Sequence, residues 1–393
     1  MKNKVIAFDA KKALLNFTGL GNYSRYAIEA MASVYPDNRY LLVSHKFLPD
    51  DRLNSLLSLP NVEVVTPDTK LGRSMPGLWR LRGGITRRMR REGVDLYHGL
   101  SNELPLDIAG SGIPSVVTIH DLIFRTFPDN YKPIDRRLYD FKFHAAARNA
   151  TRIIAISRRT RHDIERFYHI PAEKTDVVYQ GCNPLFTKPV PADAVAIVKS
   201  TYSLPSQYII CVGTVEQRKN QELLINALPM LPEQINVVIV GRGRNGYDSY
   251  LHRLGESLGV NRRVRYLTGV PTEHLPALYH EAAAAAYPSR YEGFGLPMLE
   301  ALSTGTPVIA ATGSCLEEAG GEGALYVNPL SADDFATKAM AIINDTSLRH
   351  KLVEAGTEHL SQFTKENFAR QVAATYQRAM DSSASGTMPS MSR

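Results

Sequence analysis

The chain has 393 residues, 44% of them hydrophobic and 22% charged, a composition that is ordinary for a globular protein and excludes a disordered or fibrous chain. Three cysteines without CxxC spacing exclude a disulfide framework and a cysteine-based zinc site, and they are typical of a reducing compartment. Residues 1–180 hold 28 Lys or Arg against 19 Asp or Glu, a net charge of +9, so this half is expected to meet an anionic partner, whereas the remainder has a net charge of −2.

The apolar run near the N-terminus, in MKNKVIAFD, is too short for a signal peptide because Asp9 interrupts it. No run of 18 apolar residues occurs along the chain, so no membrane-spanning helix is predicted. Together with the scattered cysteines, this favours a cytoplasmic protein.

Short apolar, β-branched runs recur along the chain, and most have the length of a buried strand. They predict strands at Val5–Phe8, Tyr40–Val43, Val62–Val65, Leu96–Tyr97, Ser115–Ile119, Arg152–Ile156, Asp176–Tyr179, Tyr208–Val212, Asn236–Val240, Val264–Leu267, Ala283–Tyr287, Pro307–Ala310 and Ala324–Val327. Helical spacing predicts helices at Asn22–Val34, Ile134–Ala147, Arg158–Phe167, Gln221–Leu228, Asp248–Leu258, Glu273–Glu281, Leu296–Ser303 and Ala332–Ile343. Such alternation predicts an α/β fold of doubly wound parallel sheets.

Three prolines within residues 183–192 (NPLFTKPVPA) disfavour regular structure, so we place a domain boundary there. The prediction is an N-terminal domain of residues 1–183 and a C-terminal domain of residues 184–365, facing each other across a cleft. Ligands of such sheets bind beyond the carboxyl ends of the strands, so the cleft is the expected site. The helical stretch Glu366–Met380 is not followed by a strand and can pack back on the N-terminal domain. Residues 382–393 are small and polar and are predicted to be disordered.

A glycine-containing segment, TGLGNYS (residues 18–24), follows the first strand and precedes a helix. Backbone amides at Gly19 and Gly21 could approach a phosphate there, since a helix N-terminus favours negative charge. A plain turn is the alternative interpretation.

The segment Lys70–Arg91 carries eight basic residues and no acidic one, together with the only Trp of the chain. Basic residues interleaved with apolar ones are typical of contact with an anionic membrane surface. The residues expected to touch a membrane or an acceptor are Trp79, Arg87, Arg88, Arg90 and Arg91. A solvated loop and an RNA-binding arm are the alternatives.

His120 directly follows the predicted strand Ser115–Ile119, at the sheet edge where site residues tend to lie. A hydrogen-bonded structural histidine is the alternative. No His or Cys cluster accompanies His120, and the chain has no Asp-x-Asp pair to hold a divalent cation on phosphates. Neither a metal nor a cofactor is therefore expected.

In the second half, the segment GTVEQRKN (213–220) follows the strand Tyr208–Val212. A guanidinium beside an ammonium, at Arg218 and Lys219, suits a diphosphate, and two solvated charges are the alternative. The segment GRGRNG (241–246) matches the GxGxxG fingerprint of dinucleotide binding, but the next strand does not end in an acidic residue that could hold a ribose. We therefore favour a tight turn over NAD binding, and a different nucleotide could still lie over this turn.

The segment YPSRYEGFGLPMLE (287–300) contains the most specific pattern of the sequence. A buried strand ends at Tyr287, a glycine-containing loop follows, and a helix starts near Pro297. Glu292 and Glu300 then offer two separated carboxylates, with backbone amides between them, to one polyhydroxylated ligand. A helix N-cap region with a surface Glu is the alternative.

Taken together, these segments resemble the nucleotide-sugar glycosyltransferases of family 4, which have the GT-B fold, over nearly the whole chain. The most specific match is the family's Glu-x7-Glu motif, formed by Glu292 and Glu300, and the segments GTVEQRKN, TGLGNYS, IHD (119–121) and AIS (155–157) are also similar. One departure is GTVEQRKN in place of a GRLEPRKN-type stretch, which keeps the charged residues and differs at Thr214, Val215 and Gln217.

The resemblance implies a role for each matched position. Arg218 and Lys219 would neutralise the donor diphosphate as it leaves, without a metal, and His120 would lie against the donor sugar. Glu300 would accept hydrogen bonds from the ribose hydroxyls, and Glu292 would hold a hydroxyl of the donor sugar. Further implied donor contacts are Gly19, Gly21, Gly213, Thr214, Gly241, Arg242, Phe294, Gly295 and Leu296.

The resemblance also implies retention of the donor's anomeric configuration, by same-face displacement through an oxocarbenium-like transition state. The segments TGLGNYSRYAI, IHDLIFRTFPDNY and AISRRTRHDI look like bacterial mannosyltransferases of surface-polysaccharide assembly, so GDP-mannose is the expected donor and a UDP-sugar the alternative. The expected acceptor is a lipid-linked glycan on the inner membrane face, with the enzyme peripheral to that membrane. A nucleotide-sugar epimerase, a non-catalytic sugar-binding protein and a nucleic-acid binder are the rival functions.

Overall fold

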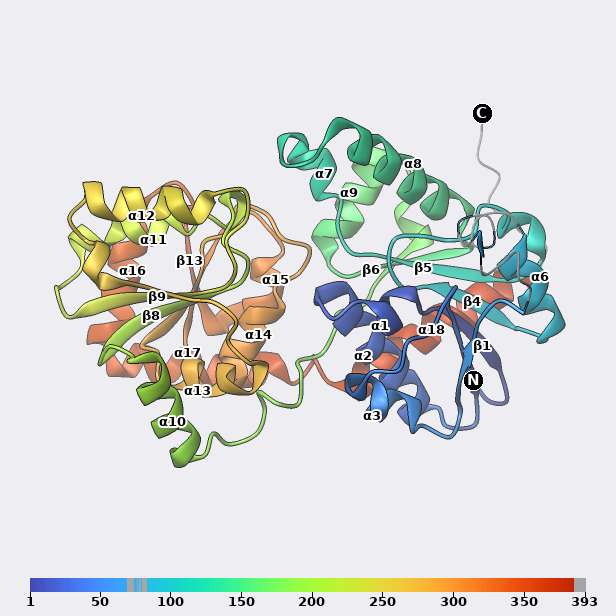
Figure 1. Ribbon diagram of the computed structural model, residues 1–393, viewed down its shortest axis with the longest axis horizontal. Coiled ribbons are helices and arrows are strands. Elements are labelled where there is room, and N and C mark those ends of the chain that lie inside the picture. Colours follow the sequence, from blue (N-terminus) through green and yellow to red (C-terminus); the bar gives the residue numbers. More distant parts are fainter. Residues whose placement is uncertain (69–73, 76, 78, 80–82, 385–393) are drawn as a thin grey trace. The chain divides into compact units, whose positions relative to one another are not determined.

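The computed structural model describes residues 1–68, 74, 75, 77, 79 and 83–384 (Figure 1). It divides into two compact units. Unit 1 contains residues 1–180 and the chain from residue 365 onward, and unit 2 contains residues 181–364. The division therefore lies three residues before the expected boundary, and the C-terminal helix belongs to unit 1.

Unit 1 is built on a seven-stranded parallel sheet with the strand order β3-β2-β1-β4-β5-β6-β7. All seven strands overlap predicted ones, and their bounds are β1 (Val5–Asp9), β2 (Arg39–Val43), β3 (Val62–Val65), β4 (Leu96–Gly99), β5 (Ser115–Ile119), β6 (Arg152–Ala155) and β7 (Thr175–Val177). The central strands are buried on both faces, which is why they are continuous apolar runs. The strand order reverses between β1 and β4, and ligands of doubly wound sheets bind beside such a reversal.

Helices cover both faces of this sheet. They are α1 (Lys11–Leu15), α2 (Gly19–Val34), α3 (Asn54–Leu57), α6 (Gly84–Arg91), α7 (Ile123–Thr126), α8 (Pro133–Asn149), α9 (Arg158–Tyr168) and α18 (Lys365–Ala384). Short 3₁₀ turns lie at Asp51–Leu53, Ala109–Ser111, Pro128–Asn130 and Ala172–Lys174. The end of α18 corrects one prediction, because residues 382–384 are helical rather than disordered, while residues 385–393 of the predicted tail lie outside the described residues.

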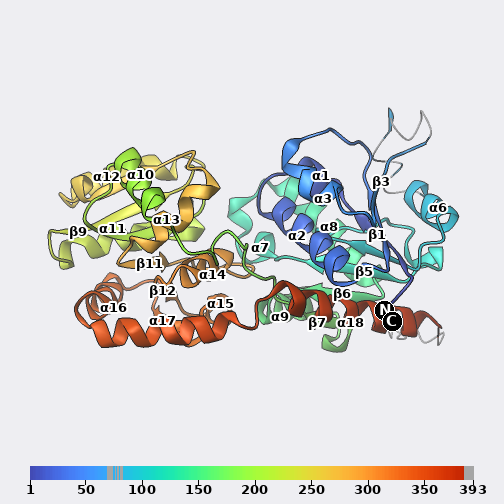
Figure 2. The ribbon, with the colours of Figure 1, turned by 90° about the horizontal axis from the view of Figure 1, so that it is seen from below.

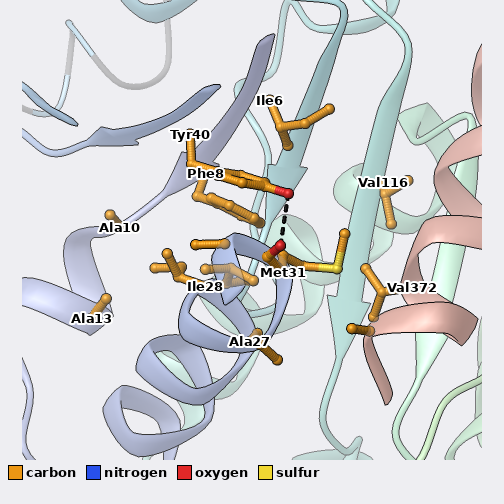
Figure 3. Close-up of a cluster of buried hydrophobic side chains, with 14 of the residues drawn as sticks. Ile6, Phe8, Ala10, Ala13, Ala27, Ile28, Met31, Tyr40, Val116 and Val372 are labelled. Carbon is orange, nitrogen blue, oxygen red and sulfur yellow. Dashed lines mark hydrogen bonds between the residues drawn. The ribbon is translucent and has the colours of Figure 1, made fainter. Parts of the chain in front are cut away.

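One core of unit 1 forms where the sheet packs against α2 and α18 (Figure 3). Phe8 of β1 and Tyr40 of β2 contact α2, and the Tyr40 hydroxyl donates a hydrogen bond of 2.8 Å to the Met31 carbonyl. Val372 of α18 belongs to the same cluster, so the C-terminal helix completes the core of unit 1. Figure 2 shows α18 lying along the sheet beside β6.

Unit 2 is built on a six-stranded parallel sheet with the order β10-β9-β8-β11-β12-β13. Its strands are β8 (Gln207–Val212), β9 (Ile235–Val240), β10 (Val264–Leu267), β11 (Ala284–Tyr287), β12 (Val308–Ala311) and β13 (Ala324–Val327). Its helices are α10 (Ala192–Tyr202), α11 (Glu222–Ala227), α12 (Tyr247–Ser257), α13 (Leu275–His280), α14 (Leu296–Ser303), α15 (Leu316–Gly320), α16 (Ala332–Asn344) and α17 (Thr346–Leu360). Further 3₁₀ turns lie at Gln217–Lys219, Leu228–Met230, Asn261–Arg263, Thr272–His274 and Gly321–Gly323.

The carboxyl ends of parallel strands meet at one edge of each sheet, and the predicted site residues follow these ends. His120 comes directly after β5 in unit 1, while Gly213, Gly241 and the loop to Glu292 come after β8, β9 and β11 in unit 2. Two doubly wound parallel sheets, as predicted, thus place the candidate residues of each unit at the edge where ligands bind.

Candidate functional site

Three charged side chains meet at the edge of the unit 2 sheet. Arg218 Nη1 lies 2.9 Å from Glu292 Oε2, and Lys219 Nζ lies 2.6 Å from Glu292 Oε1. The side chains of Arg218, Lys219 and Glu292 are only 11%, 18% and 14% exposed, so solvent screens these ion pairs weakly. We call this group, together with Glu216, the Arg-Lys-Glu cluster.

Neighbouring charges in the cluster stabilise the ionised forms of Glu292 and Arg218. Burial disfavours the ionised form of Glu292, but Lys219 and Arg218 outweigh it and lower the pKa of this carboxyl below its usual value of 4.5. Burial likewise disfavours charged Arg218, and the neighbouring Glu292 and Glu216 outweigh that effect and raise its pKa. Arg218 therefore stays charged over the range in which proteins work.

The cluster is held rigidly by its own loops. Arg218 Nη2 pairs with Glu216 Oε1 at 2.5 Å, and Nη1 donates to the Tyr291 carbonyl, also at 2.5 Å. Asn220 adopts a left-handed conformation at φ 59°, and its side-chain amide donates to the carbonyls of Pro288 and Pro329. The loop after β8 is thereby tied to the loop after β11, so two cations are positioned before any ligand arrives.

Glu300 comes eight positions after Glu292 in the sequence and lies in the middle of α14. Burial raises the pKa of its carboxyl to about 7, although a hydrogen bond from the Tyr279 side chain opposes the rise. The hydroxyl groups of Tyr279 and Tyr287 form a hydrogen bond of 2.6 Å. A buried carboxyl of this kind needs hydrogen-bond donors to remain ionised, and hydroxyls of a ligand can supply them.

The turn between the two acids presents backbone amides. Gly295 has φ 135°, a conformation that favours glycine, and α14 begins at Leu296 with neither a side-chain cap nor an acidic residue in its first turn. Phe294 is buried and its carbonyl accepts a bond from Cys315 Sγ at 2.9 Å. Among the described residues, the amides of Gly295 and Leu296 have no hydrogen-bond acceptor. An anionic or hydroxyl oxygen can occupy this helix N-terminus.

The backbone at Gly213, after β8, lies very close to the backbone at Gly241, after β9. A Cβ on Gly241 would lie 1.9 Å from the Gly213 carbonyl oxygen, so no larger residue fits there. The amides of Gly213 and Gly241 are already bonded, to the carbonyls of Val240 and Leu267. These glycines therefore permit close packing of two loops rather than offering free amides. Thr214 and the exposed Arg242 lie on the same two loops.

Only the end of the GRGRNG segment is a turn, at Asn245 and Gly246, because Gly243 pairs with Val215 in a parallel bridge. Gly246 is the residue before α12 and has φ 72°, and a Cβ on Gly243 would lie 2.4 Å from the Asp248 carboxyl carbon. The Asp248 carboxylate therefore lies against Gly243, and no larger residue fits there.

In unit 1, His120 is buried at the end of β5 and fixed from several sides. Its amide donates to Asn102 Oδ1 at 2.7 Å, and its Nε2 donates to the Leu100 carbonyl at 2.8 Å. Burial lowers the pKa of His120 to about 4, against the effect of the bond to Leu100. The ring is therefore neutral with its lone pair on Nδ1, and in the described part of the chain no protein group donates to that nitrogen.

A chain of buried polar groups lies behind His120. His98 Nδ1 lies 2.6 Å from Tyr376 Oη, and its Nε2 lies 2.8 Å from Thr118 Oγ1. The Thr118 hydroxyl is also 3.2 Å from Tyr23 Oη, and the Tyr23 ring packs edge-on against His120 at 4.5 Å. Burial and then the neighbouring His120 lower the pKa of His98 to about 3, so this histidine is neutral and structural.

The glycine-containing segment near the N-terminus differs from its prediction. Gly19 and Gly21 lie in the first turn of α2, after the short helix α1, rather than in a loop that directly follows β1. A Cβ on Gly21 would lie 1.7 Å from the Asn16 carbonyl oxygen, so Gly21 is required by packing, whereas space beside Gly19 is open. Of the two glycines, only Gly19 is placed where its surroundings admit a ligand.

The basic segment also needs a correction. Trp79 is only 8% exposed and belongs to a core cluster of unit 1, where it lies over Gly84, so it is not a surface anchor. Arg88 and Arg91 pair with Asp68, and Arg90 donates to backbone carbonyls. Arg87 also bonds back to a carbonyl, and residues 69–73, 76, 78 and 80–82 of the predicted segment lie outside the described residues.

Comparisons with known proteins bear on this arrangement. The family model "Glycosyl transferases group 1" matches residues 198–359, and the model "Glycosyltransferase Family 4" matches residues 38–184. The chain is 32% identical over 286 residues to the O-antigen chain mannosyltransferase B of Escherichia coli, covering 72% of this chain and 74% of the relative. The chain belongs to glycosyltransferase family 4. The resemblance inferred from the sequence is thereby confirmed.

Other similar proteins agree on fold and reaction class. A D-inositol 3-phosphate glycosyltransferase of Corynebacterium aurimucosum is 30% identical over 284 residues, 68% of this chain and 67% of that protein. The structure of Anabaena HepE in complex with UDP matches at a TM-score of 0.74 and 22% identity, covering 96% of this chain and all of that chain. The structure of sucrose-phosphate synthase of Thermosynechococcus elongatus matches at a TM-score of 0.73 and 20% identity, covering 97% of this chain and 100% of that chain. The predicted GT-B fold is confirmed.

Sequence reasoning missed the residues that position this glycosyltransferase's site. Asn220 and Glu216 fix Arg218 from within the GTVEQRKN segment, and Asn102 fixes His120 from the loop after β4. A signal existed for Asn220, since Asn is among the few residues that tolerate a left-handed conformation at the end of a turn. No local signal points to Asn102, because its partner lies 18 positions away.

Proposed function

We propose that this glycosyltransferase moves mannose from GDP-mannose to a hydroxyl of a lipid-linked glycan, in the assembly of a surface polysaccharide such as lipopolysaccharide. The observation that carries the donor part is the Arg-Lys-Glu cluster, where two largely shielded basic side chains lie 2.9 Å and 2.6 Å from one carboxylate. The mannosyltransferase names of similar proteins, O-antigen chain mannosyltransferase B among them, support mannose as the sugar.

In the proposed reaction, the bond between the anomeric carbon and the diphosphate oxygen breaks first. The acceptor oxygen then bonds to the same face of the sugar, and its proton passes to the departing phosphate oxygen, so configuration is retained. Negative charge grows on the diphosphate in the transition state, and Arg218 and Lys219 stabilise it there. Because these cations are held before the donor binds, little reorganisation is needed, which supports a mechanism without a metal.

In the proposal, Glu292 and Glu300 bind different parts of the donor. Glu292 already shares its oxygens between two cations, so the proposal gives it one hydroxyl of the sugar. Within the described residues Glu300 forms no ion pair, and its pKa is raised to about 7, which suits a carboxylate that accepts both ribose hydroxyls and becomes fully ionised when they bind. The free amides of Gly295 and Leu296 take a phosphate or sugar oxygen.

In unit 1, His120 offers a neutral lone pair at Nδ1 rather than a positive charge. A cation at this position would oppose an oxocarbenium ion, whereas a neutral acceptor can hold a sugar hydroxyl without that penalty. We therefore assign His120 to the sugar being transferred, with the Leu100 carbonyl and Asn102 fixing its ring and backbone.

A thermal-shift comparison of GDP, UDP, ADP and NAD⁺, followed by turnover of GDP-mannose, tests the proposal. A shift with GDP and release of GDP from GDP-mannose in the presence of a mannose-containing lipid acceptor are the expected results. A shift with UDP alone would replace the donor by a UDP-sugar, the second candidate, which the UDP complexes of the similar HepE structures favour. Conversion of the donor without transfer would indicate an epimerase, and tight binding without turnover a sugar-binding protein.

The contribution of the Arg-Lys-Glu cluster is tested by Lys219→Ala, with Lys351→Ala on the exposed surface of α17 as the matched control. Lys219→Ala should lower turnover, and the melting temperature of the GDP-free protein is measured beside it to separate loss of turnover from loss of stability. Equal turnover in Lys219→Ala and wild type would contradict the site assignment, whatever the donor.

A further inference from the structure

Helix α8 carries large apolar side chains on the side that faces solvent. Ile134, Leu138 and Phe141 are 80%, 47% and 60% exposed, and their spacing of four and three places them on one stripe of the helix. With Tyr139, this helix holds four of the twelve exposed large hydrophobic side chains of the described residues. Singly scattered apolar residues need no explanation, but a stripe on one helix marks an interaction surface.

The opposite side of α8 is already anchored in unit 1. The Phe143 ring packs edge-on against Phe124 at 5.4 Å, and Asp140 forms a two-armed ion pair with Arg125 at 2.6 and 2.7 Å. Ala146 and Ala147 are buried in the core. The helix therefore needs no outward apolar stripe for its own stability, so the stripe is available to something outside the chain.

Basic residues border this stripe. At 100° per residue, Arg137 and Arg148 lie on one flank of Ile134, Leu138 and Phe141. Both arginines are exposed, and within the described ranges neither guanidinium has an ion-pair or hydrogen-bond partner. Lys142 lies on the other flank, where it pairs with Glu103 at 3.2 Å, and the exposed Lys132 precedes the helix.

The stripe begins at the edge of the sheet that carries His120. Helix α8 connects β5 to β6 in a parallel sheet, so it runs back from the carboxyl edge to the amino edge, and its first turns lie at the carboxyl edge. Ile134, Leu138 and Phe141 all occupy the first nine residues of the helix. A surface that contacts these residues is thus brought to the functional edge of unit 1.

We infer that the stripe on α8 docks onto an anionic lipid bilayer, with Ile134, Leu138 and Phe141 entering the interface and Arg137 and Arg148 contacting lipid phosphates. An apolar stripe bordered by basic residues is complementary to acyl chains topped by anionic headgroups, whereas an acidic protein partner would leave the apolar stripe unmatched. The inference rests on the proposed function only for its purpose, which is to place a lipid-linked acceptor near His120.

Helix α6, where the sequence predicted membrane contact, is less suited to this role. Its apolar residues Ile85 and Met89 are buried, and Arg88, Arg90 and Arg91 have partners within unit 1. In the part of residues 70–91 that the structure describes, Met75 is exposed at 45%, whereas α8 presents three exposed apolar side chains on one stripe. We therefore assign membrane contact to α8.

Co-sedimentation with vesicles tests the inference on the full chain. Vesicles containing phosphatidylglycerol should bind the wild-type protein, and vesicles of phosphatidylcholine alone should bind it weakly. The triple variant Ile134→Gln, Leu138→Gln, Phe141→Gln should lose about tenfold or more of the vesicle partition coefficient, since three apolar groups leave the interface. The matched control is Ile197→Gln with Leu330→Gln, which replaces exposed apolar residues of unit 2 and should bind like wild type.

Several results would overturn the inference. One is unchanged vesicle binding in the triple variant, and another is loss of binding in Arg87→Gln with Arg91→Gln but not in the α8 variant. A third is a wild-type dimer in light scattering that becomes a monomer in the triple variant without any vesicle binding, which would make the stripe a self-interface. The GDP thermal shift is measured on each variant. If GDP-mannose is not turned over while vesicle binding still depends on α8, the proposed function fails and this inference stands.

Discussion

Glu292→Gln isolates the charge of the Arg-Lys-Glu cluster, because it keeps the size of the side chain and removes its charge. Arg218 and Lys219 would remain shielded, at 11% and 18% exposure, and among the described residues Glu216 would still pair with Arg218 while Lys219 would lose its ion pair. Breaking a buried ion pair from one side costs about 3–5 kcal/mol, and the lower end applies here since the amide oxygen can still accept from one cation. We therefore expect the free energy of unfolding to fall by about 3 kcal/mol.

The pH dependence gives the same prediction a second readout. The pKa of Glu292 is lowered on folding, so its stabilisation is present above 4.5, the ordinary pKa of the carboxyl, and is lost as pH falls through the lower folded value. Urea unfolding of the wild type should therefore show a loss of stability in acid that Glu292→Gln largely lacks. The two proteins should become more alike as pH falls.

Inorganic pyrophosphate supplies a third readout, because an added anion can replace the missing carboxylate. It should raise the melting temperature of Glu292→Gln more than that of the wild type. Glu322→Gln, at an exposed position, is the matched control and should change neither stability nor the response to pyrophosphate. A Glu292→Gln protein as stable as wild type at neutral pH, with the same acid dependence, would refute the reasoning about this cluster.

Three further predictions concern turnover, donor affinity and metal dependence. Lys219→Ala should lower kcat by about 10²–10³-fold, the usual effect of removing one preorganised group from a developing charge, while the control Lys351→Ala should not change it. Tyr279→Phe should weaken donor binding. Burial raises the pKa of Glu300 and the hydrogen bond from Tyr279 lowers it, so loss of that bond should raise this pKa further and shift the acid-side loss of donor affinity to higher pH. A pH profile identical to that of the wild type would show that Tyr279 does not act on Glu300. EDTA should leave activity unchanged, and a loss that Mn²⁺ restores would contradict transfer without a metal.

The strands were predictable because each is a short buried run. The sequence places Ser115–Ile119 and Val264–Leu267 within the same bounds as β5 and β10, and it also places Glu292 in the loop after β11 and Glu300 on the helix that follows. Contacts between loops were not predictable, because Asn220 and Pro329 are 109 positions apart. Periodicity predicts a helix near Ile134–Ala147, but a helix that is apolar on two sides does not reveal which side faces the core.

Trp79 shows why composition misled the prediction for the basic segment. Arginines and a Trp in one stretch suggest a single amphipathic surface, yet burial is decided by the residue against which each side chain packs. Gly84 lacks a side chain, and its Cβ position would lie 2.4 Å from Trp79 Cδ1, so the close approach of Trp79 requires a glycine there. A neighbouring glycine was the local feature that could have indicated an inward-facing Trp.

Because α18 completes unit 1, this unit stays unfinished until the chain has been synthesised beyond unit 2. Residues 1–180 leave the ribosome first, but Phe368, Val372 and Tyr376 of their core come last, after the whole of unit 2. Until then the apolar face of α2 and the Nδ1 of His98 lack their partners. A nascent chain would therefore present a folded unit 2 beside an open unit 1, and a truncation after Gln362 would arrest it in that state. Completion of unit 1 therefore depends on a helix that is encoded after the whole of unit 2.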